Sequence, residues 1–383
     1  MAHSRHPCIR RGIIMKVSCR LAFFTRSLGG GGAERVVVTL ASHYAAQGHT
    51  VDLVVSFRAE AYQGELHPAV RVHYLNTRRR MLAAPRLAKA LREIRPAALL
   101  ATVNTFAAVL AQRLARTPTR VILREATTPS MAFQVKETSA RKRAISETAM
   151  RWLYPRADAV VAVSKGVAQD LLNLIPQLKP KLTVIYNPVI DAEFYAKADA
   201  PLEHPWFQPN QPPVALAAGR LVALKGFDTL LRAFARVRQE IPARLVILGE
   251  GPERPNLERL AAELGVAADV DLPGFDPNPF RYMRRAGVFV LSSRYEGLPN
   301  VLIQALACGC PVVSTDCPSG PSEILDGGRY GALVPLDDAE AMAQAIVRAL
   351  SGQVAHAPAA WLEQFRVEAV AQQYLRVMLE QTP

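Results

Sequence analysis

The stretch that decides the fold runs from Leu291 to Glu323 and has the sequence LSSRYEGLPNVLIQALACGCPVVSTDCPSGPSE. An apolar run over 287–291 predicts a buried strand, and the composition of 300–308 predicts a helix. A second apolar run over 311–314 predicts another strand. A strand, a glycine-containing loop and a helix in this order form half of a parallel βαβ unit. The sequence therefore predicts an α/β fold.

The loop between the first strand and the helix contains Glu296, Gly297, Leu298 and Pro299. It lies at the carboxyl end of a strand and the amino end of a helix, where open α/β sheets bind ligands and phosphate is favoured. The Glu296 carboxylate accepts hydrogen bonds from hydroxyl groups, and Gln304, about two turns into the helix, offers an acceptor and donors. A nucleotide sugar would satisfy this arrangement. A solvated Glu296 and a surface Gln304 are the alternative that the spacing alone leaves open.

The composition and the charge distribution point to two globular domains with different surroundings. Of 383 residues, 50% are hydrophobic and 21% are charged, and no run of eighteen apolar residues predicts a membrane-spanning helix. Residues 1–200 contain 30 Lys and Arg against 13 Asp and Glu, whereas residues 201–383 contain 16 against 20. Nucleic acid, an anionic lipid surface and a phosphorylated acceptor are candidate partners of the basic half. Nucleic acid is disfavoured because the basic stretches carry few aromatic residues that could stack on bases.

Five cysteines, an odd number in a long chain, do not predict a disulfide framework and fit a reducing cytoplasm. Cys308, Cys310 and Cys317 lack a fourth ligand nearby, so we expect no metal site there. The fourteen residues before Met15 are basic and too weakly apolar for a signal peptide. We interpret them as an upstream extension, and leave open whether Met1 or Met15 is the natural start.

The first half opens with a strand over 17–25, a glycine-rich turn, a helix over 34–47 and a strand over 51–56. It has neither the G-x-G-x-x-G pattern nor a Walker lysine, so the nicotinamide and P-loop interpretations lack their residues. The segment 76–96 predicts a basic amphipathic helix, which suits either an anionic lipid surface or a solvated helix packed on its own sheet.

A segment rich in proline and polar residues, 191–214, is typical of a domain boundary. After it, a strand over 214–218 is followed by Arg220 and Lys225, two permanent positive charges that could clamp a diphosphate or could simply be solvated. Asp269 and Asp271 form a D-x-D pattern, which we interpret as part of a strand and not as a metal site.

The segment EGLPNVLIQALACGCPVVSTD resembles the signature of the family 4 glycosyltransferases, in which Glu, seven residues and a second Glu precede A-x-A-x-G-x-P-V-V. Here the second position is Gln304, which keeps an acceptor oxygen and loses the charge. The opening GGAE, the phrase GRLVALKG and the turn GF resemble other parts of that family.

The resemblance implies two Rossmann-like domains facing across a cleft, known as the GT-B fold. We expect an acceptor-binding domain over 15–198, a nucleotide-sugar-binding domain over 199–358 and a C-terminal helix over 359–383 that crosses back to the first domain.

The resemblance also implies a retaining, metal-independent transfer of a hexose-type sugar from a UDP- or GDP-sugar to a hydroxyl of a glycan or lipid-diphosphate-linked glycan. It assigns catalysis to Glu296, Arg220 and Lys225, with no cofactor. It assigns donor binding to Gly31, Gly32, Gly274, Phe275, Gly297, Leu298, Pro299, Asn300 and Gln304.

Many family members have a sugar-contacting histidine after the strand 120–124, and here Arg124 and Glu125 are the candidates for that contact or for the acceptor. The missing histidine and Gln304 leave a second interpretation open, a nucleotide-sugar-binding protein with weak or lost activity. We expect a cytoplasmic location. The basic first half suggests in addition peripheral binding to the cytoplasmic face of the inner membrane.

Overall fold

The computed structural model describes residues 18–29, 31–59, 62–136, 139–353 and 355–379. The chain forms two compact units. Unit 1 contains the described residues up to Pro188 together with those from Arg366 onward, and unit 2 is Val189–Phe365. The expected upstream extension and the choice between Met1 and Met15 lie outside the described residues.

Unit 1 is built on a parallel sheet whose order, over the described residues, is β3-β2-β1-β4-β5-β6-β7. Its central strands are buried along their length, which explains why they appear in the sequence as continuous apolar runs. The strands are β1 (Arg20–Thr25), β2 (Thr50–Val55), β3 (Arg71–Tyr74), β4 (Ala98–Thr102), β5 (Arg120–Glu125), β6 (Ala159–Ala162) and β7 (Leu182–Val184).

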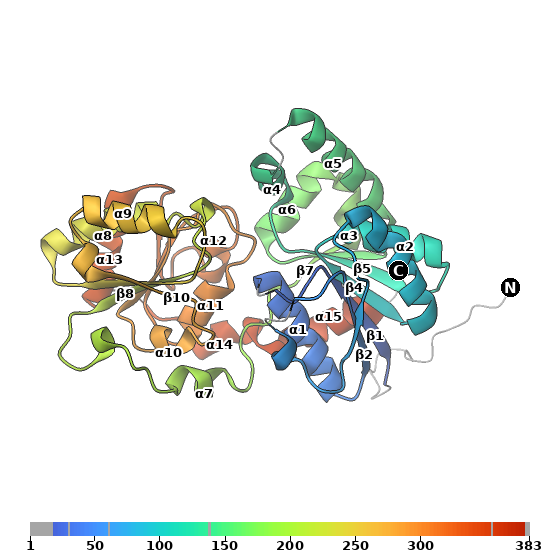
Figure 1. Cartoon of the computed structure of the whole chain (residues 1–383), viewed down its shortest axis with the longest axis horizontal. Coiled ribbons are helices and arrows are strands. Elements are labelled where there is room, and N and C mark those ends of the chain that lie inside the picture. The colour runs from blue at the N-terminus through green and yellow to red at the C-terminus, as the bar shows by residue number, and fades with distance from the viewer. Residues whose placement is uncertain (1–17, 30, 60–61, 137–138, 354, 380–383) are drawn as a thin grey trace. The chain divides into compact units, whose positions relative to one another are not determined.

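Helices cover both faces of this sheet (Figure 1). The helices of unit 1 are α1 (Gly32–Ala46), α2 (Arg80–Ile94), α3 (Thr105–Ala115), α4 (Pro129–Lys136), α5 (Ala140–Leu153), α6 (Lys165–Leu174) and α15 (Val367–Leu379). The C-terminal helix α15 packs beside α1, where the Tyr44 hydroxyl donates to the Ala371 carbonyl at 2.6 Å. The expected return of the last helix to the first domain is therefore confirmed.

The basic segment 76–96 forms α2, and its apolar side faces inward. Leu87 and Leu91 are fully buried, so this side of the helix packs within unit 1. This burial is what the second interpretation of the segment predicts, a solvated helix whose apolar side packs on its own sheet. Among the described residues, no helix combines the length and the apolar character needed to cross a membrane.

Unit 2 repeats the same architecture, with described strands in the parallel order β10-β9-β8-β11-β12-β13. These strands are β8 (Val214–Ala218), β9 (Arg244–Leu248), β10 (Val270–Gly274), β11 (Val288–Leu291), β12 (Val312–Thr315) and β13 (Ala332–Val334). The helices are α7 (Phe194–Asp199), α8 (Phe227–Glu240), α9 (Arg254–Glu263), α10 (Phe280–Met283), α11 (Asn300–Ala307), α12 (Pro321–Ile324), α13 (Ala339–Leu350) and α14 (Ala359–Leu362). The strand and helix expected around 287–314 lie within a residue or two of the observed β11, α11 and β12.

The units divide at different residues from those placed by the proline-rich segment. The amides of Val189 and Ile190 both donate to the Phe365 carbonyl, at 2.9 and 3.1 Å, so the two crossover segments lie side by side. Helix α7 then packs on α10, with the rings of Phe194 and Phe280 4.7 Å apart. Residues 189–198 therefore belong to unit 2, whereas the expected first domain extended to 198.

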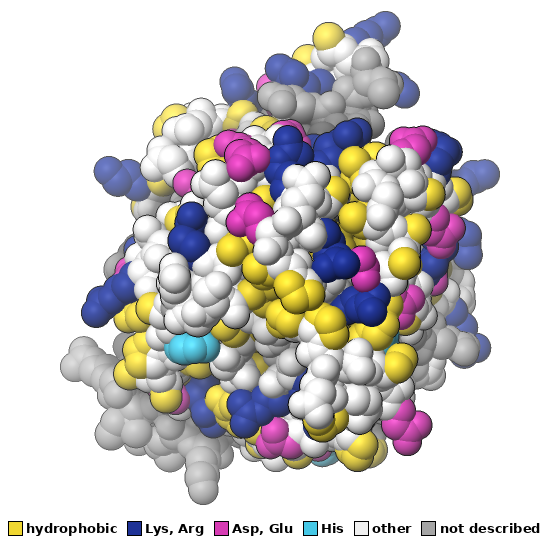
Figure 2. All heavy atoms as spheres, turned by 90° about the vertical axis from the view of Figure 1, so that its left-hand side faces the viewer, with side chains coloured by type: hydrophobic (Ala, Val, Ile, Leu, Met, Phe, Trp, Pro, Cys, Tyr) yellow, Lys and Arg dark blue, Asp and Glu magenta, His cyan; other side chains and the backbone are white. Residues whose placement is uncertain are grey.

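Charged side chains are mixed on the face that Figure 2 shows. Lys and Arg there are separated by Asp, Glu and uncharged side chains. This face differs from the continuous basic surface that is typical of nucleic-acid-binding proteins.

Candidate functional site

The site in unit 2 lies where the order of its sheet reverses. Strands β8 and β11 are neighbours, and the chain leaves them toward β9 and β12 on opposite sides. Such a switch point leaves a crevice at the carboxyl ends of the strands, which is where ligands bind in open α/β sheets. The loops after β8 and β11 carry Lys225 and Glu296, two of the residues predicted for catalysis.

The structure brings Lys225 and Glu296 into direct contact. Lys225 Nζ donates to Glu296 Oε1 at 2.6 Å, and the two side chains are 21% and 15% exposed. Ser293 Oγ donates to the same carboxylate oxygen at 2.7 Å. The Glu296 backbone is also held, because its amide donates to Pro318 O and its carbonyl accepts from Ser319 N. The carboxylate is therefore fixed in place before any ligand binds.

A close backbone approach positions Lys225. Gly226 has φ +62°, and a Cβ on it would lie 2.1 Å from the Ser292 carbonyl oxygen. Ser292 Oγ in turn donates to the Lys225 carbonyl at 2.8 Å. Only glycine fits between these loops, so the two loops of the switch point pack against each other as one piece.

The amino end of α11 faces the same loop. Its N-cap residue is Pro299, which has no side-chain acceptor with which to cap the helix. The positive end of the helix dipole adds to the charge of Lys225. Together they favour an anion such as a diphosphate.

The amino end of α1 in unit 1 differs, because its own carboxylate caps it. The Gly31 amide donates to Glu34 Oε2 at 2.8 Å, and Ser27 Oγ donates to Oε1 at 2.6 Å. The loop that contains the predicted donor contacts Gly31 and Gly32 therefore already holds an anionic group. A phosphate at this helix end would have to displace Glu34.

The remaining predicted donor contacts of unit 2 lie on separate elements. Arg220 follows β8 directly and is exposed. At the end of β10, the Gly249 amide donates to the Gly274 carbonyl at 2.7 Å, and the next residue, Phe275, is 70% exposed. Gln304 lies inside α11 and is 8% exposed, which excludes the solvated surface residue considered from the sequence.

Arg124, a candidate sugar or acceptor contact, is 1% exposed and lies within β5, not after it. Its guanidinium donates to Tyr374 Oη at 3.0 Å, to Thr102 Oγ1 at 3.0 Å and to Asn187 Oδ1 at 2.6 Å. It thus joins β4, the crossover segment and α15. This arrangement is an internal tie within unit 1, which sequence reasoning could not distinguish from a ligand contact.

Glu125, the neighbouring candidate, also has internal partners. Its Oε2 accepts from the Tyr154 hydroxyl at 2.6 Å, and Thr127 Oγ1 donates to Oε1 at 3.3 Å. Burial raises the pKa of the Glu125 carboxyl above its usual value, and the hydrogen bonds to Tyr154 and Thr127 oppose that shift.

The D-x-D carboxylates are engaged by other side chains of unit 2. Asp269 pairs with Arg238 at 2.7 Å and with Arg244 at 2.5 Å, and Asp271 contacts His204 at 3.0 Å. Across the described ranges, no three His, Cys, Asp or Glu side chains are grouped as metal ligands. The two ion pairs of Asp269 and the hydrogen bond of Asp271 to His204 account for the D-x-D pattern.

The cysteines near the decisive stretch are buried thiols. Burial raises the pKa of Cys308 and of Cys317 to about 12, and the positive charges of Arg284 and Lys225 oppose this rise. The negative charge of Glu296 also raises the pKa of Cys317. These thiols therefore stay protonated beside the site.

Sequence reasoning did not single out a group of residues in unit 1 that line a hollow at the ends of β1 to β4. They are Arg26, Ser56, Phe57, Thr77, Arg78, Arg79, Ala83, Val103 and Asn104. Arg26 and Phe57 directly follow the strands predicted over 17–25 and 51–56, which was the available signal. Their proximity depends on the strand order, which the sequence alone does not reveal.

Comparison with known proteins supports one family over both units. Residues 30–193 match the model described as Glycosyltransferase Family 4, and residues 212–352 match the model described as Glycosyl transferases group 1. The chain is 31% identical over 341 residues to an N-acetylgalactosamine-N,N'-diacetylbacillosaminyl-diphospho-undecaprenol 4-alpha-N-acetylgalactosaminyltransferase of Campylobacter jejuni. That match covers 85% of this chain and 89% of the relative.

Two further similarities agree with this result. The lipopolysaccharide core biosynthesis glycosyltransferase LpsE of Rhizobium meliloti is 32% identical over 59% of this chain and 65% of its own length. The crystal structure of Anabaena HepE in complex with UDP-glucose superimposes with a TM-score of 0.78 at 18% identity, covering 94% of this chain and 99% of that one. The fold is therefore GT-B, with two Rossmann-like domains, and the chain belongs to the family 4 glycosyltransferases.

Proposed function

We propose that this glycosyltransferase moves a hexose-type sugar from a UDP- or GDP-sugar to a hydroxyl of a glycan or lipid-linked glycan, with retention of configuration. The observation that carries the proposal is the contact of Lys225 with Glu296 at the switch point of unit 2. A fixed cation and a fixed carboxylate side by side suit a diphosphate joined to a sugar, because the two parts of that ligand need opposite partners.

In the proposed complex, the diphosphate lies against Lys225, Arg220 and the amino end of α11. Lys225 and the amino end of α11 are in place before the reaction, so they can stabilise the charge that develops on the departing diphosphate without reorganising. This would make a metal ion unnecessary. The positive end of the α11 dipole is suited to phosphate oxygens.

Glu296 would orient the sugar by accepting from one of its hydroxyls. Ser293 and Lys225 both donate to Glu296 Oε1, which fixes the rotamer of the carboxylate. Gln304 would accept from a ribose hydroxyl, and the exposed Phe275 would lie against the base. No protein nucleophile is assigned, and the leaving phosphate would take the acceptor proton on the face from which it departs.

The acceptor and the location are proposed from the relatives and from the surface of unit 1. The Campylobacter relative is named for a diphospho-undecaprenol substrate, and the Rhizobium relative for lipopolysaccharide core. On α5, Ile145 and Trp152 are 60% and 51% exposed among basic residues, a pattern that suits an anionic membrane surface. We therefore place the enzyme in the cytoplasm, bound peripherally to the inner membrane.

The test is release of UDP or GDP from a panel of nucleotide sugars, with wild type and Glu296→Gln. The variant keeps the shape of the side chain and removes its charge, so we expect a loss of about 10²-fold or more in kcat with retained nucleotide binding. Glu263→Gln, which removes an exposed carboxylate at the far end of α9, is the matched control. Full turnover in Glu296→Gln would refute the assignment, and proton NMR of the product anomer tests retention separately.

A further inference from the structure

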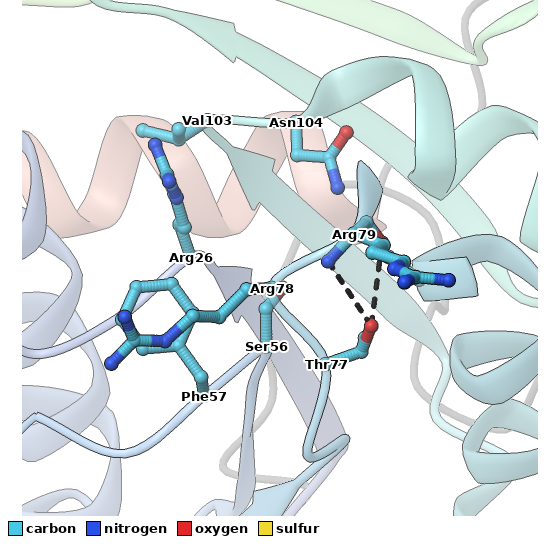
Figure 3. Close-up of a pocket in the computed structure, with 9 residues that line it drawn as sticks. Arg26, Ser56, Phe57, Thr77, Arg78, Arg79, Val103 and Asn104 are labelled. Carbon is cyan, nitrogen blue, oxygen red and sulfur yellow. Dashed lines mark hydrogen bonds between the residues drawn. The ribbon is translucent and has the colours of Figure 1, made fainter. Parts of the chain in front are cut away.

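Unit 1 has its own switch point, and the hollow lies there. Strand β1 pairs with β2 on one side and β4 on the other, so the chain leaves them in opposite directions. Arg26 follows β1, Ser56 follows β2, Arg78 follows β3 and Asn104 follows β4. Figure 3 shows that the labelled side chains come from these four loops and surround a common space. The space in the hollow that the centre of a water-sized molecule can occupy is about 20 Å³, and the hollow is open to solvent.

The hollow is strongly basic. Arg26, Arg78 and Arg79 line it, and among its described lining residues there is no Asp or Glu. The guanidinium carbons of Arg26 and Arg78 lie 5.6 and 5.0 Å from the centroid of the same Phe57 ring. Bringing two like charges onto one ring is unfavourable without a negative charge nearby, so this arrangement suits an anion.

An unsatisfied hydroxyl at the hollow also points to a ligand. Ser56 is 4% exposed, and its Oγ has no hydrogen-bond partner among the described residues. A buried hydroxyl without a partner is unfavourable, so such a group is expected where a ligand atom completes it.

The rim of the hollow is strained. Val103 and Asn104 have φ of +57° and +64°, and positive φ is a true outlier for a β-branched residue. The turn presents the start of α3, and the Asn104 side chain does not cap that helix. Strain of this kind concentrates at ligand sites. The rim, the arginines and Ser56 together offer mainly hydrogen-bond donors.

We infer that this hollow binds a diphosphate group of the acceptor. Guanidinium groups bind phosphoryl oxygens in pairs of hydrogen bonds, which matches three arginines around one space. The identification of the ligand as the acceptor rests on the proposed function, whereas the anion site itself rests only on the structure of unit 1. The basic first half then selects acceptors by their phosphate charge and leaves the sugar donor to unit 2.

The test is calorimetric titration of inorganic pyrophosphate into the full chain saturated with whichever of UDP and GDP it binds, which blocks the donor site. We expect Arg26→Ala and Arg78→Ala each to weaken pyrophosphate binding by about tenfold. Arg113→Ala removes an arginine that is also exposed, from the last turn of α3, and should change binding less than about twofold. Equal weakening in all three variants would show nonspecific attraction to a basic surface and would overturn the site.

Ser56→Ala distinguishes a ligand site from a structural role. It should weaken pyrophosphate binding about fivefold while leaving the unliganded melting temperature unchanged or higher, because it removes an unsatisfied hydroxyl. A lower melting temperature with unchanged binding would refute the role given to Ser56.

Farnesyl diphosphate and glucose 1-phosphate distinguish the two sources of the phosphate, a lipid diphosphate and a sugar phosphate. Tighter binding of farnesyl diphosphate, lost in Arg78→Ala, supports a lipid-linked acceptor, whereas tighter binding of glucose 1-phosphate overturns the diphosphate assignment. If pyrophosphate binds through Arg78 but no nucleotide sugar is turned over, the proposed function fails and the anion site stands. If turnover is normal and pyrophosphate does not bind, the inference fails and the proposed function stands.

Discussion

Replacing Arg124 by Met tests whether this side chain is a structural tie. The substitution keeps a long apolar stem and removes a buried guanidinium with three hydrogen bonds. Each bond to a charged group is worth about 1.5–3 kcal/mol, and removing the buried charge returns several kcal/mol of desolvation. Because Asn187, Thr102 and Tyr374 would be left without this donor, we expect a net loss of about 3 kcal/mol from unit 1.

The assay is native-state hydrogen exchange, because a chain with two units need not unfold in one step. Amides of α15 should exchange about 100-fold faster in Arg124→Met, and those of α13 in unit 2 should be unchanged. Tyr374→Phe removes one of the three bonds and should cost about 1.5–3 kcal/mol. Unchanged exchange of α15 together with lost transfer activity would refute the structural role and return Arg124 to the acceptor site.

Three further outcomes are expected. Gly226→Ala should weaken nucleotide binding at least tenfold, because its Cβ would collide with the facing carbonyl of Ser292. The control Gly265→Ala, with φ +72° and nothing within 4 Å, should lower the free energy of unfolding by only about 1–2 kcal/mol. Equal melting temperatures and equal nucleotide affinities for the two variants would contradict this. Glu125→Gln should raise the melting temperature at pH 7 and lose that advantage toward pH 4, because the raised pKa of Glu125 makes its carboxylate form destabilise the fold as pH rises; a pH-independent difference would refute the sign. Cys308 and Cys317, with pKa values of about 12, should resist iodoacetamide at pH 8 until urea unfolds the chain, and rapid labelling of the native protein would contradict their burial.

The fold could be predicted because its strands are buried on both faces and its helices start at clear signals. The apolar run 214–218 coincides with β8, and Ser164, whose residue type is common at helix starts, accepts from the Val167 amide at 3.1 Å. Local chemistry decides such features, so they are visible in a short window of sequence.

The contacts within the site could be predicted only in part. Lys225 and Glu296 each carried a local signal at the end of a strand, but they are 71 residues apart and meet because β8 and β11 pair. Arg124 had the same local signal and is buried instead. Whether a strand-end charge faces ligand or core depends on the tertiary partners that cover it, which the local pattern does not contain.

The hollow of unit 1 depends even more on topology. Arg26 and Asn104 are separated by 78 positions, and they come together because β4 inserts beside β1. The domain boundary is also a tertiary feature, since Val189 joins unit 2 through the Phe365 carbonyl and not through composition.

The measurement that tests the central claim most directly is thermal stabilisation of wild type and Lys225→Ala by UDP, GDP, ADP and their sugars, with EDTA and with magnesium. At a ligand concentration of 100 Kd, binding adds about 2.7 kcal/mol, which raises the melting temperature of a unit of this size by about 5–10 °C. The account predicts that one nucleoside diphosphate family gives this shift, that magnesium does not change it and that Lys225→Ala loses most of it. A shift of the same size in Lys225→Ala, or no shift with any nucleotide, would contradict the placement of the donor site at Lys225 and Glu296.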